Sequence, residues 1–488
     1  MGTTGPWDLL VVGGGAAGLA GAYAAAEIGA RVALVERDRT GGDCLWTGCV
    51  PSKALISVAA QVAAARRAAP YIGSAVATPR VDLGAVMHHV QASIATIEPL
   101  EDSPQALQAA GVTVLHGDAS FTGDGHLSVD GTHHTYRRAL LATGASPVVP
   151  DVPGLAEAAP LTTGTVWGLR RLPDRLTVIG GGPVGCELSQ AFARLGTQVT
   201  LVEAAPRLLV REDPDAAAVV HRALIADGVQ VLLGTRPVKV VADAGLPGEV
   251  HTEDGIHERT IGFDSLLVAT GRRARTAGLG LDLLGVRLTG QGAVLVSRTL
   301  RTSNARVWAA GDVTPFPHLT HLAGYHGALA AANALLGLRR SVDLSAVPRV
   351  VYTDPEVAAV GAATWSATGH AQPRVVTRGH DQVHRAVAEA RIDGFSRLAL
   401  NERGTRIVGA TLVGPRAGES IAELTLAVRS RMRLTDYAGV LHAYPTYADG
   451  PWNAAIDQVR RRLAQPAVQR ASRAWLATRR ASADLRRP

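Results

Sequence analysis

The sequence predicts an α/β protein of about three domains, in which two related nucleotide-binding units precede a smaller α+β domain. Its 488 residues exceed the roughly 250–300 that one hydrophobic core usually serves. A strand, a glycine-rich turn, a helix and a second strand recur in the same order in residues 10–36 and 177–203. Beyond about residue 346 the pattern changes to alternating strands and amphipathic helices.

Composition and charge exclude several classes of protein. Hydrophobic residues make up 47% and charged residues 19% of the chain, which is typical of a folded protein. Three cysteines are too few for a disulfide-built scaffold or a multi-cysteine zinc domain. The net charge of +7 comes entirely from residues 451–488, which hold nine arginines and two aspartates. We therefore expect no nucleic-acid-binding face.

We expect the N-terminal segment to carry no targeting signal. Residues 1–8 lack the basic side chains with which a secretory signal begins. Residues 9–26 are uncharged and long enough to suggest a membrane span, but five of these 18 residues are glycine. A glycine turn between a strand and a helix explains them better, so we expect a cytoplasmic protein without a membrane span.

The repeated unit is the fingerprint of a Rossmann-like dinucleotide-binding β-α-β fold. The first glycine permits a tight turn, the second lets a pyrophosphate approach the backbone, and the third lets helix and strand pack closely. The helix N-terminus attracts phosphate, and a terminal acidic residue can accept hydrogen bonds from ribose hydroxyls. These residues are Gly13, Gly15, Gly18 and Glu36 in the first copy and Gly180, Gly182, Gly185 and Glu203 in the second.

Three further segments close apolar strands. Ala-Thr-Gly ends one strand at Gly144 and another at Gly271, and Gly-Asp ends a third at Asp312. Ligands of open α/β sheets bind at the carboxyl edge of the strands, and glycine there allows close backbone contact with a cofactor or a neighbouring domain. A helix is also expected at 322–336, strands at 347–351, 395–400 and 407–413, and helices at 420–431 and 452–463.

Cys44 and Cys49 lie five residues apart, before a predicted helix. Such positions in a regular helix are about 7.5 Å apart along the axis, which is too far for a relaxed disulfide. If the two bond, the backbone near Gly48 must leave the helix, and Pro51 suits the first turn of the next one. Cys49 at that helix N-terminus would favour its thiolate. Inert core cysteines, a zinc site and a structural disulfide are alternatives, but beside a dinucleotide-binding domain we favour a redox-active pair.

Lys53 follows Cys49 by four residues and is one of only two lysines, against 47 arginines. Its compact ammonium could stabilise negative charge on a thiolate or a flavin. Chance retention is the alternative explanation.

Several motifs occur together with the doubled fingerprint: Gly-Gly-Asp-Cys-x4-Cys-Val-Pro-Ser-Lys at 41–53, the two Ala-Thr-Gly segments, Ala-Ala-Gly-Asp at 309–312, and Tyr-Pro-Thr at 444–446. In this combination the chain resembles the class I FAD-dependent pyridine nucleotide-disulfide oxidoreductases, notably dihydrolipoamide dehydrogenase and mercuric reductase. The resemblance covers residues 8 to about 460. It implies an FAD-binding domain at 1–150 with a second part at 276–345, an NAD(P)-binding domain at 151–275, a dimerisation domain at 346–465 and a basic tail at 466–488.

The resemblance also implies roles for single residues. Cys44 would exchange with the substrate, Cys49 would face the flavin, and Lys53 would pair with Glu187. A homodimer is implied, in which the C-terminal domain completes the partner's active site. FAD would be held by Gly13, Gly15, Gly18, Glu36, Lys53, Gly144 and Asp312, and NAD(P) by Gly180, Gly182, Gly185, Glu203 and Gly271.

Glu203 favours NADH over NADPH, because a carboxylate hydrogen-bonds the ribose 2′-hydroxyl but repels a 2′-phosphate. Arg207, Arg272 and Arg273 lie in segments that could soften this preference.

Two features depart from the pattern of the family. Dihydrolipoamide dehydrogenase would have a catalytic His followed by Glu where this chain has Tyr444 and Asp449. A phenol, with a pKa near ~10, is a poor proton shuttle, and losing a general base typically costs ~10²–10⁴ in rate. His442 would substitute if Tyr444 points away. Mercuric reductase would have a C-terminal cysteine pair, but no cysteine follows Cys186, which we interpret as a small packed residue.

We therefore expect an enzyme in which NAD(P)H reduces FAD, FAD reduces the cysteine pair, and the dithiol reduces a disulfide or similar acceptor. The alternatives are a quinone-type oxidoreductase that reduces its acceptor from the flavin, and a non-catalytic redox sensor. The basic tail, with Trp475 and Leu476, is expected to be a solvated or dimer-capping extension rather than an amphipathic helix on an anionic surface.

Overall fold

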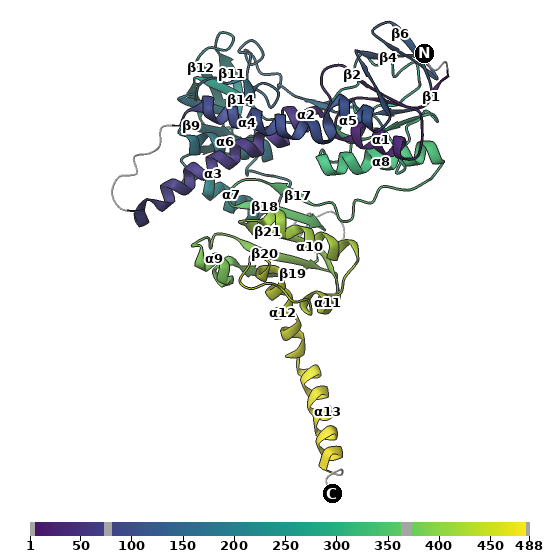
Figure 1. Cartoon of the computed structure of the whole chain (residues 1–488). Helices are drawn as coiled ribbons and strands as arrows, with labels where there is room; N and C mark the ends of the chain where they lie inside the picture. The colour runs from purple at the N-terminus through teal and green to yellow at the C-terminus, as the bar shows by residue number, and fades with distance from the viewer. Residues whose placement is uncertain (1–4, 73–80, 363–372, 485–488) are drawn as a thin grey trace. The chain divides into compact units, whose positions relative to one another are not determined.

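The computed structural model of the chain describes residues 5–72, 81–362 and 373–484. By internal contacts the chain divides into two compact units, drawn in Figure 1. The first comprises Met1–Leu208 and Leu224–Asp343, and the second comprises Leu209–Ala223 and Leu344–Pro488.

The first unit contains a seven-stranded sheet with a parallel core. Its strands follow the order β3-β2-β1-β6-β5-β4, and β16 also pairs with β6. Strands β3, β2, β1, β6 and β16 run parallel, whereas β4, β5 and β6 form antiparallel pairs. The strands are β1 (Trp7–Val12), β2 (Val32–Glu36), β3 (Val112–His116), β4 (Ala119–Gly123), β5 (His126–Val129), β6 (Thr132–Leu141) and β16 (Val307–Ala309).

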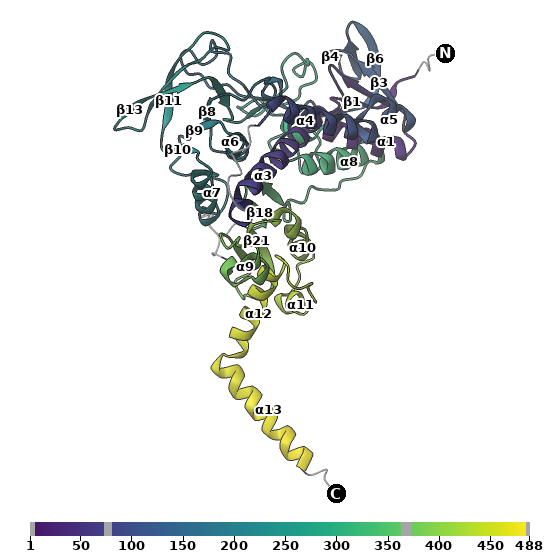
Figure 2. The ribbon, with the colours of Figure 1, turned by 60° about the vertical axis from the view of Figure 1, so that its left-hand side comes forward.

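Strand β1 is apolar on both faces because both faces are covered. Leu9 and Val11 pack with helices α1 (Ala16–Glu27) and α8 (Thr320–Leu336), whereas Leu10 and Val12 belong to a second core on the other side. Helices α1 and α8 lie side by side in Figures 1 and 2. The uncharged stretch 9–26 is therefore a strand, a turn and a helix.

A second parallel sheet carries the second fingerprint. Its order is β10-β9-β8-β14, and helix α6 (Pro183–Leu195) follows β8. The two sheets confirm the predicted pair of dinucleotide-binding folds. The strands are β8 (Arg175–Ile179), β9 (Gln198–Val202), β10 (Gln230–Leu232) and β14 (Ser265–Val268), with an antiparallel sheet of β11 (Arg236–Val241), β12 (Gly248–Glu253) and β13 (Glu258–Phe263), and a pair of β7 (Ala145–Pro147) and β15 (Arg272–Ala274).

Several helices connect these strands. They are α2 (Gly42–Trp46), α3 (Cys49–Ile72), α4 (Leu83–Ile97), η1 (Glu98–Asp102), α5 (Pro104–Ala109), η2 (Val166–Gly168), α7 (Pro214–Ala226) and η3 (Gly311–Val313). One described stretch, Gly42–Ala69, is long and apolar enough by composition to cross a membrane. A third of its most apolar window is buried inside the protein, and core helices of soluble proteins have the same property, so this is weak evidence for a span.

The second unit is built on an antiparallel sheet of order β17-β18-β21-β20-β19. Helices α10, α11 and α12 share one core with β18, β20 and β21, which confirms the α+β prediction. The elements are β17 (Arg349–Val351), β18 (Glu356–Gly361), β19 (Arg374–Gly379), η4 (His380–Gln382), α9 (His384–Ala388), β20 (Phe395–Leu400), β21 (Ile407–Gly414), α10 (Ala417–Arg429), α11 (Leu434–Ala438), α12 (Asp449–Leu463) and α13 (Pro466–Asp484).

Residues 209–223 belong to this second unit by their contacts. Glu212 pairs with Arg349, and Arg397 binds both Asp213 and Asp215. Figure 2 shows α13 running away from α12 as a separate helix. Its side chains are exposed over nearly the whole described length, Trp475 and Leu476 included, so the tail is a helix that packs on little else of this chain.

Two glycines of α8 provide a matched test of the α1–α8 contact. A Cβ added at Gly327 would lie 1.9 Å from the Ala17 carbonyl oxygen, whereas one at Gly324 would meet nothing closer than 3.9 Å. We expect Gly327→Ala to destabilise the first unit by about 1–3 kcal/mol through overpacking. Gly324→Ala should be neutral or stabilising by up to ~1 kcal/mol through helix propensity. Thermal unfolding of the two variants compares them directly, and equal transition temperatures would contradict the packing described here.

Candidate active site

The two fingerprint turns have the same geometry. A Cβ on Gly18 would lie 1.8 Å from the Gly13 carbonyl oxygen, and one on Gly185 would lie 1.8 Å from that of Gly180. The leading glycines have φ of +105° and +109°, a conformation that side chains disfavour. Gly13 packs on Ala142 and Gly180 on Ala269, so each Ala-Thr-Gly segment supports the turn of its own sheet.

The middle glycines leave the helix N-termini open. A Cβ on Gly182 would meet nothing within 4 Å, and one on Gly15 would meet only the Gly42 Cα at 3.8 Å. Neither α1 nor α6 has a side-chain cap. Their first N–H groups can therefore bind phosphate, and these cradles fit dinucleotides.

The acidic residues at the ends of β2 and β9 hold the same turns. Gly14 N donates to Glu36 Oε2 at 2.7 Å, and Gly181 N donates to Glu203 Oε2 at 2.6 Å. Their Oε1 atoms accept from Asp38 N and Ala205 N. Each carboxylate therefore lies against its glycine turn. The remaining lone pairs of its oxygens can accept hydrogen bonds from ribose hydroxyls.

Cys44 and Cys49 come together because the helix breaks between them. Cys44 lies in α2, which ends at Trp46, and Cys49 is the first residue of α3. A Cβ on Gly48 would lie 2.7 Å from the Asp43 carbonyl oxygen, so glycine is needed at the break. Pro51 lies in the first turn of α3, as its position in the sequence predicts.

Both cysteines of the pair are free thiols, with Cys44 half-buried and Cys49 exposed. Cys49 Sγ lies 3.2 Å from Thr320 Oγ1. The hydrogen bond from Cys44, with that of Thr320 and the nearby Lys53 ammonium, lowers the pKa of Cys49 to about 6. The same bond to Cys49, followed by burial, raises the pKa of Cys44. One thiolate and one thiol therefore coexist at neutral pH.

Lys53 and Glu187 link the two nucleotide-binding folds. Lys53 Nζ on α3 lies 2.8 Å from Glu187 Oε2 on α6. The Glu187 side chain is 7% exposed and that of Lys53 is 36% exposed. A buried carboxylate requires such a partner, so the pair fixes an ammonium near the thiolate.

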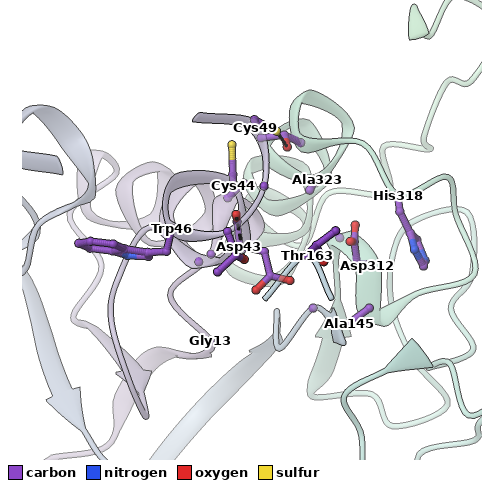
Figure 3. Close-up of a pocket in the computed structure, with 18 of the residues that line it drawn as sticks. Gly13, Asp43, Cys44, Trp46, Cys49, Ala145, Thr163, Asp312, His318 and Ala323 are labelled. Atoms are coloured by element: carbon purple, nitrogen blue, oxygen red, sulfur yellow. Dashed lines mark hydrogen bonds between the residues drawn. The ribbon is translucent and has the colours of Figure 1, made fainter. Parts of the chain in front are cut away.

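A pocket joins these parts, and Figure 3 shows the two cysteines, Asp43 and Asp312 along it. It is lined by the first glycine turn, Glu36, both cysteines, Lys53, Gly144, Asp312 and, from the second fold, Val184 and Glu187. Arg272 and Arg275 also line it and pair with Asp43, and Arg272 lies 3.6 Å from Asp312. The sequence suggested Arg272 as a modifier of nucleotide preference, but its strand β15 pairs with β7 and turns it into this pocket.

Sequence reasoning missed several residues of the pocket. Thr320 begins α8, 271 residues after Cys49, and Trp167 donates to the Thr47 carbonyl from η2. The motif spacing offers no signal for either. Gly271 has φ of +133° but does not line the pocket.

The C-terminal motif lies in the second unit. Tyr444 is exposed and precedes a cis Pro445. Asp449 is buried and accepts from Thr446 N at 3.1 Å, so it holds the turn rather than the phenol. His442 has both ring nitrogens engaged, by Glu423 and the Val440 carbonyl.

Comparisons with known proteins agree with this geometry. Residues 7–327 match the family model "Pyridine nucleotide-disulphide oxidoreductase". The chain belongs to this family. Residues 347–455 match the dimerisation domain of the same family.

Two curated relatives and one solved structure are similar over most of their length. A mercuric reductase of Staphylococcus aureus is 35% identical over 93% of this chain and 82% of its own. A dihydrolipoyl dehydrogenase of Chlamydia muridarum is 33% identical over 91% and 95%. The crystal structure of LpdA from Mycobacterium tuberculosis matches with a TM-score of 0.82 and 29% identity, covering 92% of this chain and 99% of that one.

As a pyridine nucleotide-disulphide oxidoreductase, the protein is an FAD-dependent enzyme that uses a pyridine nucleotide and a redox-active cysteine pair. Its dimerisation domain indicates a homodimer.

Removing the Thr320 hydroxyl should weaken the thiolate of Cys49. In reduced enzyme we expect thiolate absorbance to appear as pH rises through about 6. We expect Thr320→Val to move this midpoint upward by about one to two pH units, since hydrogen bonds to charged groups contribute about 1.5–3 kcal/mol. Thr47→Val is the matched control, because its hydroxyl donates to the Asp43 carbonyl. An unchanged midpoint in Thr320→Val would contradict the contact.

Proposed function

We propose that this enzyme reduces a disulfide, or a metal ion bound through sulfur, by way of Cys44. The observation that carries the proposal is the pair of free thiols at the α2–α3 break, with Cys49 Sγ 3.2 Å from Thr320 Oγ1 and a pKa lowered at Cys49 and raised at Cys44. FAD, when bound, supplies the electron pair that it receives as hydride from the nicotinamide.

The unequal pKa values of Cys44 and Cys49 give the two sulfurs different roles in this proposal. Cys49, at the start of α3 beside Lys53 and Thr320, keeps the charge of the reduced pair. Cys44 keeps its proton and must lose it before it attacks an acceptor, because the thiolate is the nucleophile. After that attack, Cys49 resolves the mixed disulfide and restores the Cys44–Cys49 bond.

The matched turns support the cofactor-binding roles in this proposal. FAD is held by Gly13, Gly15, Gly18 and Glu36, with Lys53, Gly144 and Asp312 in the same pocket. NAD(P) is held by Gly180, Gly182, Gly185 and Glu203, with Gly271 after β14. In this proposal the FAD domain spans 1–150 and 276–345, the NAD(P) domain 151–275, the dimerisation domain 346–465 and the tail 466–488. Residues 209–223, within the NAD(P) range, cluster with the second unit.

NADH is the preferred nucleotide in this proposal. The Glu203 carboxylate lies against the second glycine turn, where it accepts a ribose hydroxyl and repels a phosphate. Arg272 does not offset this repulsion of a 2′-phosphate, because it pairs with Asp43 and lies near Asp312 in the pocket that contains the cysteines. The ratio of kcat/KM for NADH and NADPH measures the preference.

The homodimer shares its active site in this proposal, and Tyr444 and Asp449 belong to the segment that each subunit lends to the other. We place the enzyme in the cytoplasm, without a membrane span and without a nucleic-acid partner. The charge excess of residues 451–488 lies mostly on α12 and the separate helix α13, outside the pocket described above.

A second candidate function is reduction of a quinone or dye directly from the flavin. The observation that favours it is the motif at 444–449, where Asp449 accepts from Thr446 N and so does not orient the Tyr444 phenol for dithiol exchange. A redox sensor without turnover is a weaker alternative, because the pocket contains a complete cysteine pair.

The variant Cys44→Ser separates these functions. We expect at least a 10²-fold loss of acceptor reduction with a small disulfide, because serine cannot form the mixed disulfide. Flavin reduction by NADH should continue. Steady-state assays with a disulfide and with a quinone, together with rapid-mixing reduction by NADH, make the comparison.

Cys186→Ala is the matched control, since this third cysteine is buried within α6. It should leave disulfide reduction nearly intact. Undiminished disulfide reduction by Cys44→Ser would show that electrons leave from the flavin and would eliminate the first function.

A further inference from the structure

Tyr444 and His384 form an exposed hydrogen-bonded pair on the second unit. Tyr444 Oη lies 2.8 Å from His384 Nδ1, and their rings meet edge to face with centroids 5.8 Å apart. Tyr444 is 69% exposed, and His384 is also exposed. The pair therefore presents a phenol to the surroundings with an imidazole directly behind it.

We propose that His384 is a positioning residue that enables Tyr444 to carry protons during dithiol exchange. This inference rests on the proposed function, because it requires Tyr444 of the partner subunit to reach the cysteine pair. A phenol alone is a poor proton acceptor at neutral pH. A phenol that donates to an imidazole can accept one proton while it passes its own to the ring.

The other polar groups near Tyr444 are not placed to accept the phenol proton. Asp449 is buried and accepts from Thr446 N. His442 binds Glu423 and stacks on Trp452, with centroids 5.2 Å apart. In the described part of this unit, His384 is therefore the imidazole that contacts the phenol.

Most charged groups near His384 form ion pairs or hydrogen bonds with residues other than His384. On the same helix, Arg385 pairs at 2.5 Å with Glu389, which follows the helix end. Tyr447, from the C-terminal motif, donates to Glu389 at 2.8 Å. On the preceding turn, burial lowers the pKa of His380 to about 4, so this ring is neutral near pH 7, and Asp381 is an exposed carboxylate. His384 itself is open to solvent, which allows it to exchange a proton with water.

The reduction of one substrate disulfide takes two thiol–disulfide exchanges, and the Tyr444–His384 relay moves a proton in the first. The Cys44 thiol passes its proton to Tyr444 Oη as the phenol proton moves to His384 Nδ1, and the Cys44 sulfur attacks the substrate disulfide. The relay then runs backwards and protonates the leaving thiolate, which gives one free thiol and a Cys44–substrate disulfide. The Cys49 thiolate attacks the Cys44 sulfur, the second substrate thiolate leaves and takes a proton from solvent, and Cys44–Cys49 is oxidised.

The test compares His384→Gln with Tyr444→Phe in the full-length homodimeric holoenzyme. With hydroxyethyl disulfide as the probe, we expect each variant to lose about 10²-fold in acceptor reduction, the lower end for a lost general base. The double variant should lose no more than either single variant, because both interrupt one relay. Reduction of the enzyme by NADH should be unchanged in all three.

Two readouts distinguish a relay from a structural role. The wild-type rate should depend on a protonation step that vanishes in His384→Gln, whereas the Cys49 thiolate titration stays. Added imidazole should restore part of the activity of His384→Ala. The loss should be smaller with an aromatic disulfide, whose thiolate leaves without a proton.

His257→Gln, an exposed histidine of the first unit, is the control and should match the wild type. Wild-type rates and pH dependence in His384→Gln, while Cys44→Ser is inactive, would overturn this inference alone. Equal disulfide reduction by Cys44→Ser and the wild type would instead overturn the proposed function on which it rests.

Discussion

The candidate site depends on the backbone at Gly48, where α2 ends and α3 begins. A side chain at this position would collide with the Asp43 carbonyl oxygen, and a continuous helix would hold residues 44 and 49 about 7.5 Å apart along its axis. The break brings the two sulfurs together and gives Cys49 the N-terminus of a 24-residue helix. A thiolate at that position gains from the unpaired N–H groups and the helix dipole.

The surroundings then give the two sulfurs different chemistry. Cys49 receives hydrogen bonds from Cys44 and Thr320 and lies near the Lys53 ammonium, which Glu187 fixes from the second nucleotide-binding fold. Cys44 is buried beside the charged sulfur, so its proton stays. In the proposed function this asymmetry gives electron flow a direction, because charge accumulates on Cys49 and Cys44 attacks the acceptor once a base removes its proton. The Tyr444–His384 pair supplies that base in our proposal.

Local patterns in the sequence were enough to predict the architecture. The fingerprint glycines act on residues within the same turn, so Gly13 and Gly180 could be recognised from spacing alone, and the start of α3 followed from Pro51. Strand β20 has the bounds expected from its alternation. Strand β17 is shorter than expected, and α10 begins at Ala417 rather than at residue 420.

What could not be predicted depends on contacts between distant segments. Thr320 reaches Cys49, Arg272 reaches Asp43, and His384 reaches Tyr444 from other elements. Periodicity within a segment carries no information on such contacts. The same holds for residues 209–223, which follow the second fingerprint in sequence but cluster with the C-terminal unit. The tail helix α13 was expected only as an extension, because its alanine- and arginine-rich sequence has few apolar side chains to bury.

An anaerobic titration of the holoenzyme with NADH, followed by absorbance, tests the central claim that Cys49 places a thiolate against the flavin. We expect the first equivalent to produce a long-wavelength absorption while the flavin stays oxidised, and this absorption to fade as pH falls through about 6. It should be absent in Cys49→Ser. Direct bleaching of the flavin by the first equivalent, without a long-wavelength absorption at any pH, would show that no Cys49 thiolate lies against the flavin.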